Sequence, residues 1–152
     1  MSGAVSWFPG HMHKALKQMH RQLKAIDLVL EVRDARVPFS ASNAEFDKLI
    51  THKRRIVVLS KSDLADPSFE QVIARRLQGQ KQKPFFTSLS DPSSVRKLVG
   101  ACRSWLKQES SAVSHLLMVV GLPNTGKSSL INAMRRLSPS SEGRLRRQRG
   151  GA

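Results

Sequence analysis

A phosphate-binding loop motif is the feature that most constrains the fold of this 152-residue sequence. Residues 121–128 read GLPNTGKS and fit the pattern G-x-x-x-x-G-K-[ST], and the apolar run 116–120 before them predicts a buried strand. The glycines allow a tight turn whose backbone N–H groups face anionic oxygens, and a helix predicted from Ser128 adds its positive end. Lys127 would reach the terminal phosphates and the Ser128 hydroxyl would bind Mg²⁺. The alternative is a glycine-rich turn that binds nothing.

Apolar runs alternate with helical patterns along the rest of the chain. The predicted strands cover residues 28–33, 56–60, 84–88 and 116–120. The predicted helices cover residues 12–26, 67–78, 92–107 and the segment from Ser128 onwards. This alternation favours an α/β fold with a parallel sheet between helices. Residues 138–152 offer little apolar surface, so we expect a domain over 1–137 followed by a basic, disordered tail.

The chain is strongly basic, with 26 Lys and Arg against 11 Asp and Glu and a formal net charge of +15. This balance favours a polyanionic partner such as RNA or an anionic membrane. The predicted helix over 12–26 has lysines opposite an apolar stripe, as transit peptides and membrane-surface helices do, although a core-packed helix explains it too. The single cysteine, Cys102, excludes an intrachain disulfide, and no apolar stretch approaches the ~20 residues of a membrane span.

A second nucleotide motif, SKSD at residues 60–63, follows a predicted strand. The Asp63 carboxylate can accept hydrogen bonds from the ring N–H and the exocyclic amine of guanine, whereas adenine presents an acceptor at that ring nitrogen. The Lys61 stem would cover the base. Ser60 stands where guanine-nucleotide-binding proteins usually have Asn or Thr, and by itself the motif also fits a surface turn.

The base motif precedes the phosphate loop, which is the reverse of the order in ordinary small GTPases. Four segments carry a resemblance to a known family: WFPGHM at 7–12, DARVPFS at 34–40 followed by Asn43, KSDL at 61–64 and GLPNTGKSSLIN at 121–132. Through them the sequence resembles the YlqF-type circularly permuted ribosome-assembly GTPases, and among them the mitochondrial ribosome-associated branch. The resemblance covers residues 5 to about 136. It implies a P-loop NTPase fold, a circularly permuted G domain, that binds GTP and GDP.

The resemblance also implies partners and a location. These are the large ribosomal subunit and its rRNA, in the mitochondrial matrix, where peripheral association with the inner membrane is an alternative. A bacterial cytoplasmic relative is another alternative.

Individual residue roles carry over from the family. His11 is the catalytic candidate for hydrolysis, although it would also simply begin the basic helix. Asn124 matches an asparagine linked with K⁺ beside the phosphates. We expect a structural turn at Asp34 and Arg36. The residues expected to bind the nucleotide are Ser60, Lys61, Asp63, Thr87, Ser88, Pro123, Asn124, Thr125, Gly126, Lys127, Ser128 and Ser129.

Family members continue beyond the phosphate loop with a switch segment, a D-x-x-G motif and a C-terminal helical RNA-binding domain, and this sequence has none of these after Ser128. We therefore expect an incomplete G domain without two strands, which would leave 116–120 as an exposed apolar edge. Weak nucleotide affinity and little GTP turnover would follow. The rival interpretations are a non-catalytic RNA- or ribosome-binding fragment with a vestigial nucleotide loop, and an unstable truncated isoform.

Overall fold

The computed structural model describes residues 3–6, 12–39, 44–109, 111, 114–122 and 124–137. Within these residues, five parallel strands form one sheet in the order β1-β5-β2-β3-β4. The strands are β1 (Gly3–Ser6), β2 (Leu28–Asp34), β3 (Arg55–Ser60), β4 (Lys83–Phe86) and β5 (Leu117–Gly121). The α-helices are α1 (Met12–Leu23), α2 (Ala44–Ile50), α3 (Glu70–Gly79), α4 (Pro92–Glu109) and α5 (Lys127–Arg136). The expected α/β class with a parallel sheet is therefore confirmed.

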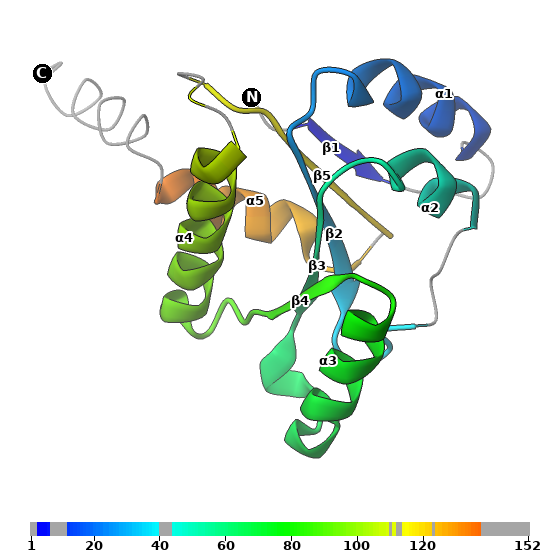
Figure 1. Ribbon diagram of the computed structural model, residues 1–152. Coiled ribbons are helices and arrows are strands. Elements are labelled where there is room, and N and C mark those ends of the chain that lie inside the picture. Colours follow the sequence, from blue (N-terminus) through cyan, green and yellow to red (C-terminus); the bar gives the residue numbers. More distant parts are fainter. Residues whose placement is uncertain are drawn as a thin grey trace, which may run out of the picture.

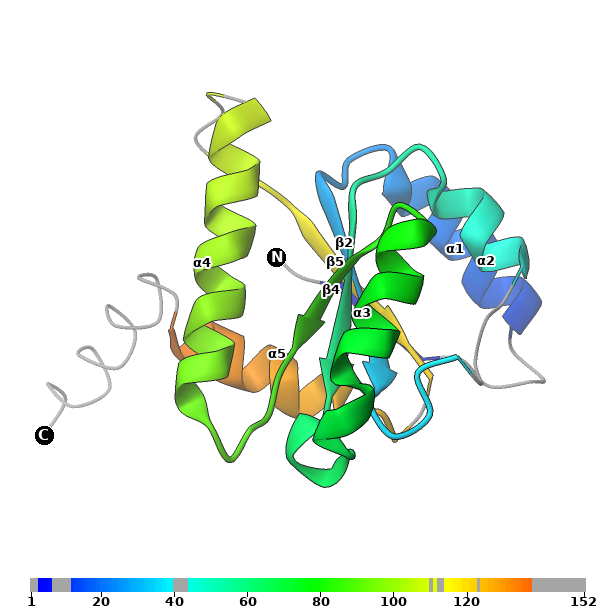
Figure 2. The ribbon, with the colours of Figure 1, turned by 60° about the horizontal axis from the view of Figure 1, so that its bottom comes forward.

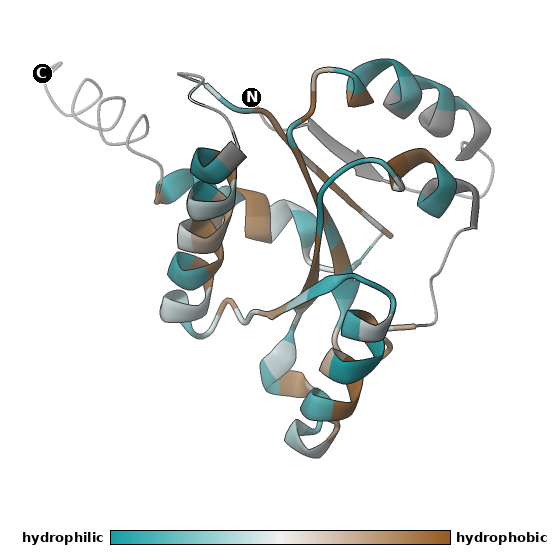
Figure 3. Ribbon diagram, viewed as in Figure 1, coloured by the Kyte–Doolittle hydropathy of each residue, from teal (hydrophilic) through white to brown (hydrophobic). Residues whose placement is uncertain are grey.

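Helices cover both faces of the sheet (Figures 1 and 2). Helices α4 and α5 lie on one face, and α1, α2 and α3 lie on the other. Because successive strand residues point to opposite faces, Leu28, Leu30 and Val32 of β2 join the cluster under α4 and α5, whereas Val29 joins the cluster under α1 and α2. The central strands are accordingly apolar over most of their length (Figure 3).

Strand β5 lies inside the sheet, so the expectation of an exposed apolar edge was wrong. On one side β5 pairs with β2, from Leu28↔Leu117 to Val32↔Gly121. On its other side it pairs with β1. Strand β1 was not predicted, because its four residues, GAVS, contain no apolar run. A short strand from the start of the described chain therefore covers the phosphate-loop strand.

Most other predicted elements agree with the structure to within a few residues. The exceptions are α2, which the sequence did not predict, and the segment from Pro67, which starts as a 3₁₀ turn over Pro67–Phe69 before α3. Leu23 and Ile26 are buried in the cluster beneath α1 and α2, which favours the core-packed interpretation for this end of the basic helix. Among the described residues, no helix combines the length and apolar character needed to cross a membrane. Residues 138–152 lie outside the described residues, so the domain boundary at 137 stays a prediction.

Candidate functional site

The phosphate-loop motif connects the carboxyl end of β5 to the start of α5. Gly121 ends β5 beside β2, and a Cβ atom there would lie 2.6 Å from the Val32 carbonyl oxygen, so only glycine fits. The loop then contains two left-handed residues, Asn124 with φ of 64° and Gly126 with φ of 82°. The Leu130 N–H donates to the Gly126 carbonyl at 2.9 Å and closes the first turn of α5. The backbone therefore curls tightly before the helix begins.

Lys127 is folded inward, and its side chain is 5% exposed. Its Nζ atom donates to the Gly121 carbonyl oxygen at 3.1 Å. Burial lowers the pKa of Lys127, because desolvation disfavours the ammonium form. Ser128 and Ser129, at the start of α5, are exposed. The loop thus combines one buried cation with two hydroxyl groups that solvent can reach.

The base motif contacts the phosphate loop directly, although the two are far apart in sequence. The Ser60 hydroxyl, 6% exposed, donates to the Thr125 carbonyl oxygen at 2.5 Å. Lys61 has a left-handed backbone with φ of 56°, and its Nζ atom donates to the Asn124 carbonyl oxygen at 2.7 Å. A Cβ atom at Gly126 would lie 3.9 Å from Lys61 Cε, so the lysine stem runs alongside the loop.

Asp63 lies next to the loop that follows β4, which carries Thr87 and Ser88 from the residues expected to bind the nucleotide. The Ser88 hydroxyl donates to Asp63 Oδ1 at 2.8 Å. The two segments are also joined through their backbones, because the Ser62 N–H donates to the Thr87 carbonyl oxygen at 3.1 Å. Thr87 and Ser88 are buried, whereas Asp63 is exposed, which leaves the other carboxylate oxygen accessible to a ligand.

The expected turn at Asp34 and Arg36 is present and adjoins the base motif. Arg36 Nη2 lies 2.7 Å from Asp34 Oδ2, and Lys61 Nζ lies 3.5 Å from the same oxygen. The hydrogen bond from Arg36 is the main cause that lowers the pKa of Asp34 to about 2, and the charge of Lys61 contributes. Asp34 is therefore ionised at neutral pH and helps to hold the Lys61 ammonium group near the phosphate loop.

These segments enclose a pocket of about 270 Å³. Seven predicted nucleotide-binding residues line it, namely Ser60, Lys61, Asp63, Thr87, Ser88, Gly126 and Ser129. The other four lining residues were not among those expected to bind the nucleotide, although they belong to the quoted motifs or adjoin Ser88 in sequence; they are Leu64, Leu89, Ser90 and Leu130. Drug-sized ligands fill ~300–1,000 Å³, so the pocket matches one part of a nucleotide, such as its base.

Several predicted site residues are not part of this pocket. Asn124, Thr125, Lys127 and Ser128 belong to the phosphate loop but do not line the pocket. His11 and Pro123 lie outside the described residues, so the catalytic role of His11 stays a prediction. Among the described residues, no group of three or more His, Cys, Asp or Glu side chains could hold a metal ion. The Mg²⁺ site predicted at Ser128 stays a prediction.

A parallel sheet with a phosphate loop after an interior strand, and a base motif earlier in the chain, defines a circularly permuted G domain of the P-loop NTPase class. No protein-family model matches the chain. It is 41% identical over 138 residues to Short integuments 2, mitochondrial, of Arabidopsis thaliana (90% of this chain, 36% of the relative). It is 40% identical over 136 residues to Mitochondrial ribosome-associated GTPase 1 of Mus musculus (86% of this chain, 42% of the relative). It is 34% identical over 138 residues to Ribosome biogenesis GTPase A of Bacillus cereus (86% and 47%).

Solved structures lead to the same family. The GNP-bound crystal structure of YlqF from T. maritima superposes with a TM-score of 0.60 at 31% identity, and covers 80% of this chain and 48% of that one. The chain is therefore a homologue of the YlqF-type circularly permuted GTPases, among which mitochondrial ribosome-associated GTPase 1 is a close sequence relative. It spans less than half the length of these relatives.

We expect the Gly121→Ala variant to lose stability. Its Cβ would press on the Val32 carbonyl within the β2–β5 pairing, and the strand cannot shift without breaking the ladder. Overpacking of this kind costs about 1–3 kcal/mol, to be measured as the free energy of unfolding in urea. Gly100→Ala is the matched control, because no atom lies within 4 Å of its Cβ and the site is within α4, where alanine gains ~0.5–1 kcal/mol. Equal effects of the two substitutions would contradict the proposed contact.

Proposed function

We propose that the chain is the guanine-nucleotide-binding part of a GTPase that acts in assembly of the mitochondrial ribosome and in mitochondrial translation. One observation carries the proposal: the base motif and the phosphate loop, although far apart in sequence, meet at the carboxyl edge of the sheet. Lys61 joins them through the Asn124 carbonyl, and Ser88 joins Asp63 to the loop after β4. A diphosphate bound at the loop would then place its base next to Asp63.

Each group has a role that its chemistry supports. The N–H groups of the loop and the N-terminal end of α5 bind the phosphate chain, and Lys127 exchanges its bond to the Gly121 carbonyl for bonds to phosphate oxygens. That exchange is favourable because a carbonyl compensates a buried ammonium group less well than an anion does. Asp63 reads the guanine ring through its free carboxylate oxygen, and the Lys61 stem covers the base.

The cations proposed for the site fit its donors. Mg²⁺ prefers oxygen ligands and usually binds few protein groups together with nucleotide phosphates and water. The exposed Ser128 hydroxyl at the start of α5 would supply one such ligand. Asn124, also exposed, is the proposed contact for K⁺. A bound Mg²⁺ ion would neutralise charge on the phosphates during hydrolysis.

The cellular role is proposed from the relatives. They are named mitochondrial ribosome-associated GTPase and ribosome biogenesis GTPase. We extend to this chain the large ribosomal subunit and its rRNA as partners, with a location in the mitochondrial matrix and peripheral contact with the inner membrane. His11 is the proposed catalytic residue of the complete active site.

Nucleotide-dependent melting of the chain tests this proposal. A ligand that binds only the folded state at 100 times its Kd adds ~2.7 kcal/mol, which is a rise of roughly 5–10 °C in Tm for a chain of this size. We expect that rise with GDP and not with ADP, because adenine offers no donor at the ring nitrogen facing Asp63. An equal rise with both nucleotides would contradict guanine recognition, and no rise with saturating GDP would contradict nucleotide binding.

A further inference from the structure

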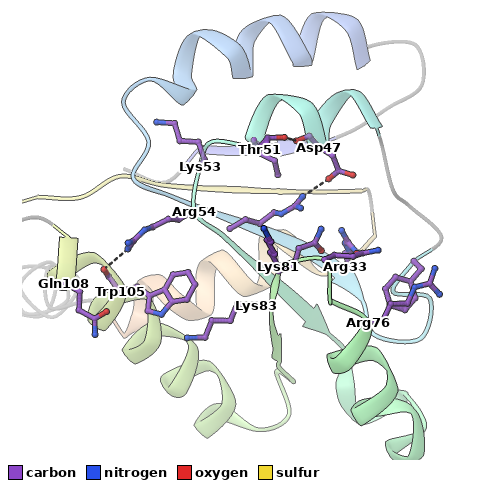
Figure 4. Close-up of a pocket in the computed structure, with 15 residues that line it drawn as sticks. Arg33, Asp47, Thr51, Lys53, Arg54, Arg76, Lys81, Lys83, Trp105 and Gln108 are labelled. Atoms are coloured by element: carbon purple, nitrogen blue, oxygen red, sulfur yellow. Dashed lines mark hydrogen bonds and ion pairs between the residues drawn. The ribbon is translucent and has the colours of Figure 1, made fainter. Parts of the chain in front are cut away.

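A second, larger cavity of about 900 Å³ lies away from the nucleotide pocket (Figure 4). Of the 15 residues that line it, seven are Arg or Lys and one, Asp47, is acidic. Its walls come from α2 and the loop after it, the end of α3 and the loop after it, the end of α4, the amino-terminal ends of β3 and β4, and Arg33 and Phe39 at and beyond the end of β2. We name it the basic groove and define it by Arg55, Arg76, Lys81, Lys83 and Trp105 among its lining residues.

Two of the seven cations are neutralised by carboxylates. Arg33 Nε lies 2.8 Å from Glu31 Oε1, and both side chains are buried. Arg55 Nη1 lies 3.1 Å from Glu31 Oε2 and 2.6 Å from Asp47 Oδ1. Glu31 and Asp47 thus pair with these two arginines and offset only part of the positive charge of the groove.

Three other cations keep their charge for a ligand. Among the described residues, no carboxylate forms an ion pair with Arg76, Lys81 or Lys83. The Arg76 guanidinium lies 4.2 Å from the centre of the Phe39 ring, and Lys83 Nζ lies 4.2 Å from the centre of the Trp105 ring. Aromatic rings orient a cation without neutralising it, so these side chains are positioned and the groove stays electropositive.

The groove also contains an unused hydrogen-bond acceptor. Gln82 Oε1 is buried and is the one such side-chain atom in the described part of the chain without a partner. Gln82 lines the basic groove between Lys81 and Lys83. A buried acceptor without a donor costs free energy, so a rotation of the Gln82 side chain that brings Oε1 to the groove would let a donor on the ligand satisfy it.

We propose that the basic groove binds a strand of RNA through its phosphate backbone. RNA carries regularly spaced phosphates, which Arg76, Lys81 and Lys83 would bind. It also carries 2′-hydroxyl and amino groups, which would donate hydrogen bonds to Gln82. Protein interfaces are anchored by apolar and aromatic side chains, whereas charged and amide side chains form most of this lining. The preference for RNA over an acidic protein rests in part on the proposed ribosomal function.

The groove and the nucleotide pocket can be occupied together. They share no lining residue. The groove includes Arg55 and Lys83, which begin β3 and β4, whereas the nucleotide pocket includes Ser60 and Thr87, at and just beyond the opposite ends of these strands. RNA binding at the groove therefore needs no nucleotide, and each site can be tested without the other.

Fluorescence anisotropy with a labelled single-stranded RNA tests the proposal. The Arg76→Gln/Lys81→Asn double variant removes two cations, and asparagine tolerates the left-handed backbone of Lys81, φ 58°. Each phosphate contact on a single strand contributes ~0.7 to the slope of log K against log salt, so we expect affinity at 0.1 M salt to fall roughly 25-fold and the slope to fall by about 1.4. DNA of the same sequence, which lacks the 2′-hydroxyl, should bind the unmodified chain more weakly than RNA does.

The matched control is Lys14→Gln/Lys17→Gln, which removes the same charge from exposed positions on α1. Equal losses in the two double variants would overturn the groove as the site, and equal affinity for RNA and DNA would overturn the preference for RNA. Displacement of RNA by poly-glutamate at equal charge would favour an acidic protein partner instead. A GDP-induced rise in Tm in every variant verifies folding. If GDP binding is absent while groove-dependent RNA binding persists, the proposed function fails and this inference stands.

Discussion

Replacing Lys127 with alanine is expected to weaken GDP binding severely. The ammonium group is buried and donates to the Gly121 carbonyl oxygen inside the loop, where the proposed phosphates would bond to it directly. Truncating one side of a buried charge pair costs about 2–5 kcal/mol, which weakens binding by roughly 30-fold to several thousand-fold. Isothermal titration of GDP into the Lys127→Ala variant and the unmodified chain measures the difference.

Lys107→Ala is the control for this prediction, because it removes one lysine from an exposed position on α4 outside both cavities. Its GDP affinity should equal that of the unmodified chain. Melting curves without ligand establish that each variant is folded. A Lys127→Ala variant that is folded and binds GDP with unchanged affinity would show that the phosphates do not lie at residues 121–128.

The Asp63→Asn variant should bind GDP more weakly and xanthosine diphosphate more tightly than the unmodified chain does. The carboxylate accepts two bonds from guanine donors, and hydrogen bonds to charged groups contribute ~1.5–3 kcal/mol each, so GDP binding should weaken about 100-fold or more. Xanthine carries an oxygen where guanine has its amine, and the asparagine N–H₂ can donate to it. Competition between the two diphosphates for a fluorescent nucleotide measures the reversal of preference.

Asp66→Asn serves as the comparison for Asp63→Asn. Asp66 lies three residues further along the same segment and does not line the nucleotide pocket. Its carboxylate instead accepts a hydrogen bond from the Ser68 N–H at 2.9 Å. Its removal should leave the preference for GDP unchanged. Loss of that preference in both variants would attribute it to general disturbance of the loop, and an Asp63→Asn variant that still prefers GDP would exclude Asp63 as the base contact.

Local patterns in the sequence were sufficient to predict most strands and helices and to locate the two nucleotide-binding motifs. Alternating apolar runs and helical stripes predicted most of the strands and helices, because burial on both faces of a parallel sheet requires such runs. The contact of Ser60 and Lys61 with the phosphate loop agrees with the joint site that the two motifs implied. A phosphate-binding motif and a base-binding motif must lie close together to bind one nucleotide, so their chemistry implied this contact.

Contacts between distant segments could not be predicted in the same way. One of the two partners of β5 is β1, a four-residue strand without an apolar run, and only the sheet order reveals it. The basic groove could not be predicted for the same reason, because Arg55, Arg76 and Lys83 come together only when β3, α3 and β4 are placed side by side. Single residues in separate loops leave no periodic signal.

The position of β5 has a consequence for the order in which the molecule can form. Ribosomes synthesise β1 and β2 first and β5 last, yet β5 must enter between them. Until then β1 has no neighbour in the described sheet, and the nascent polypeptide exposes one flank of β2. Insertion of a late strand between two early ones closes long loops and slows folding. A nucleotide bound at residues 121–128 would therefore stabilise the inserted strand only after that loop has left the exit tunnel.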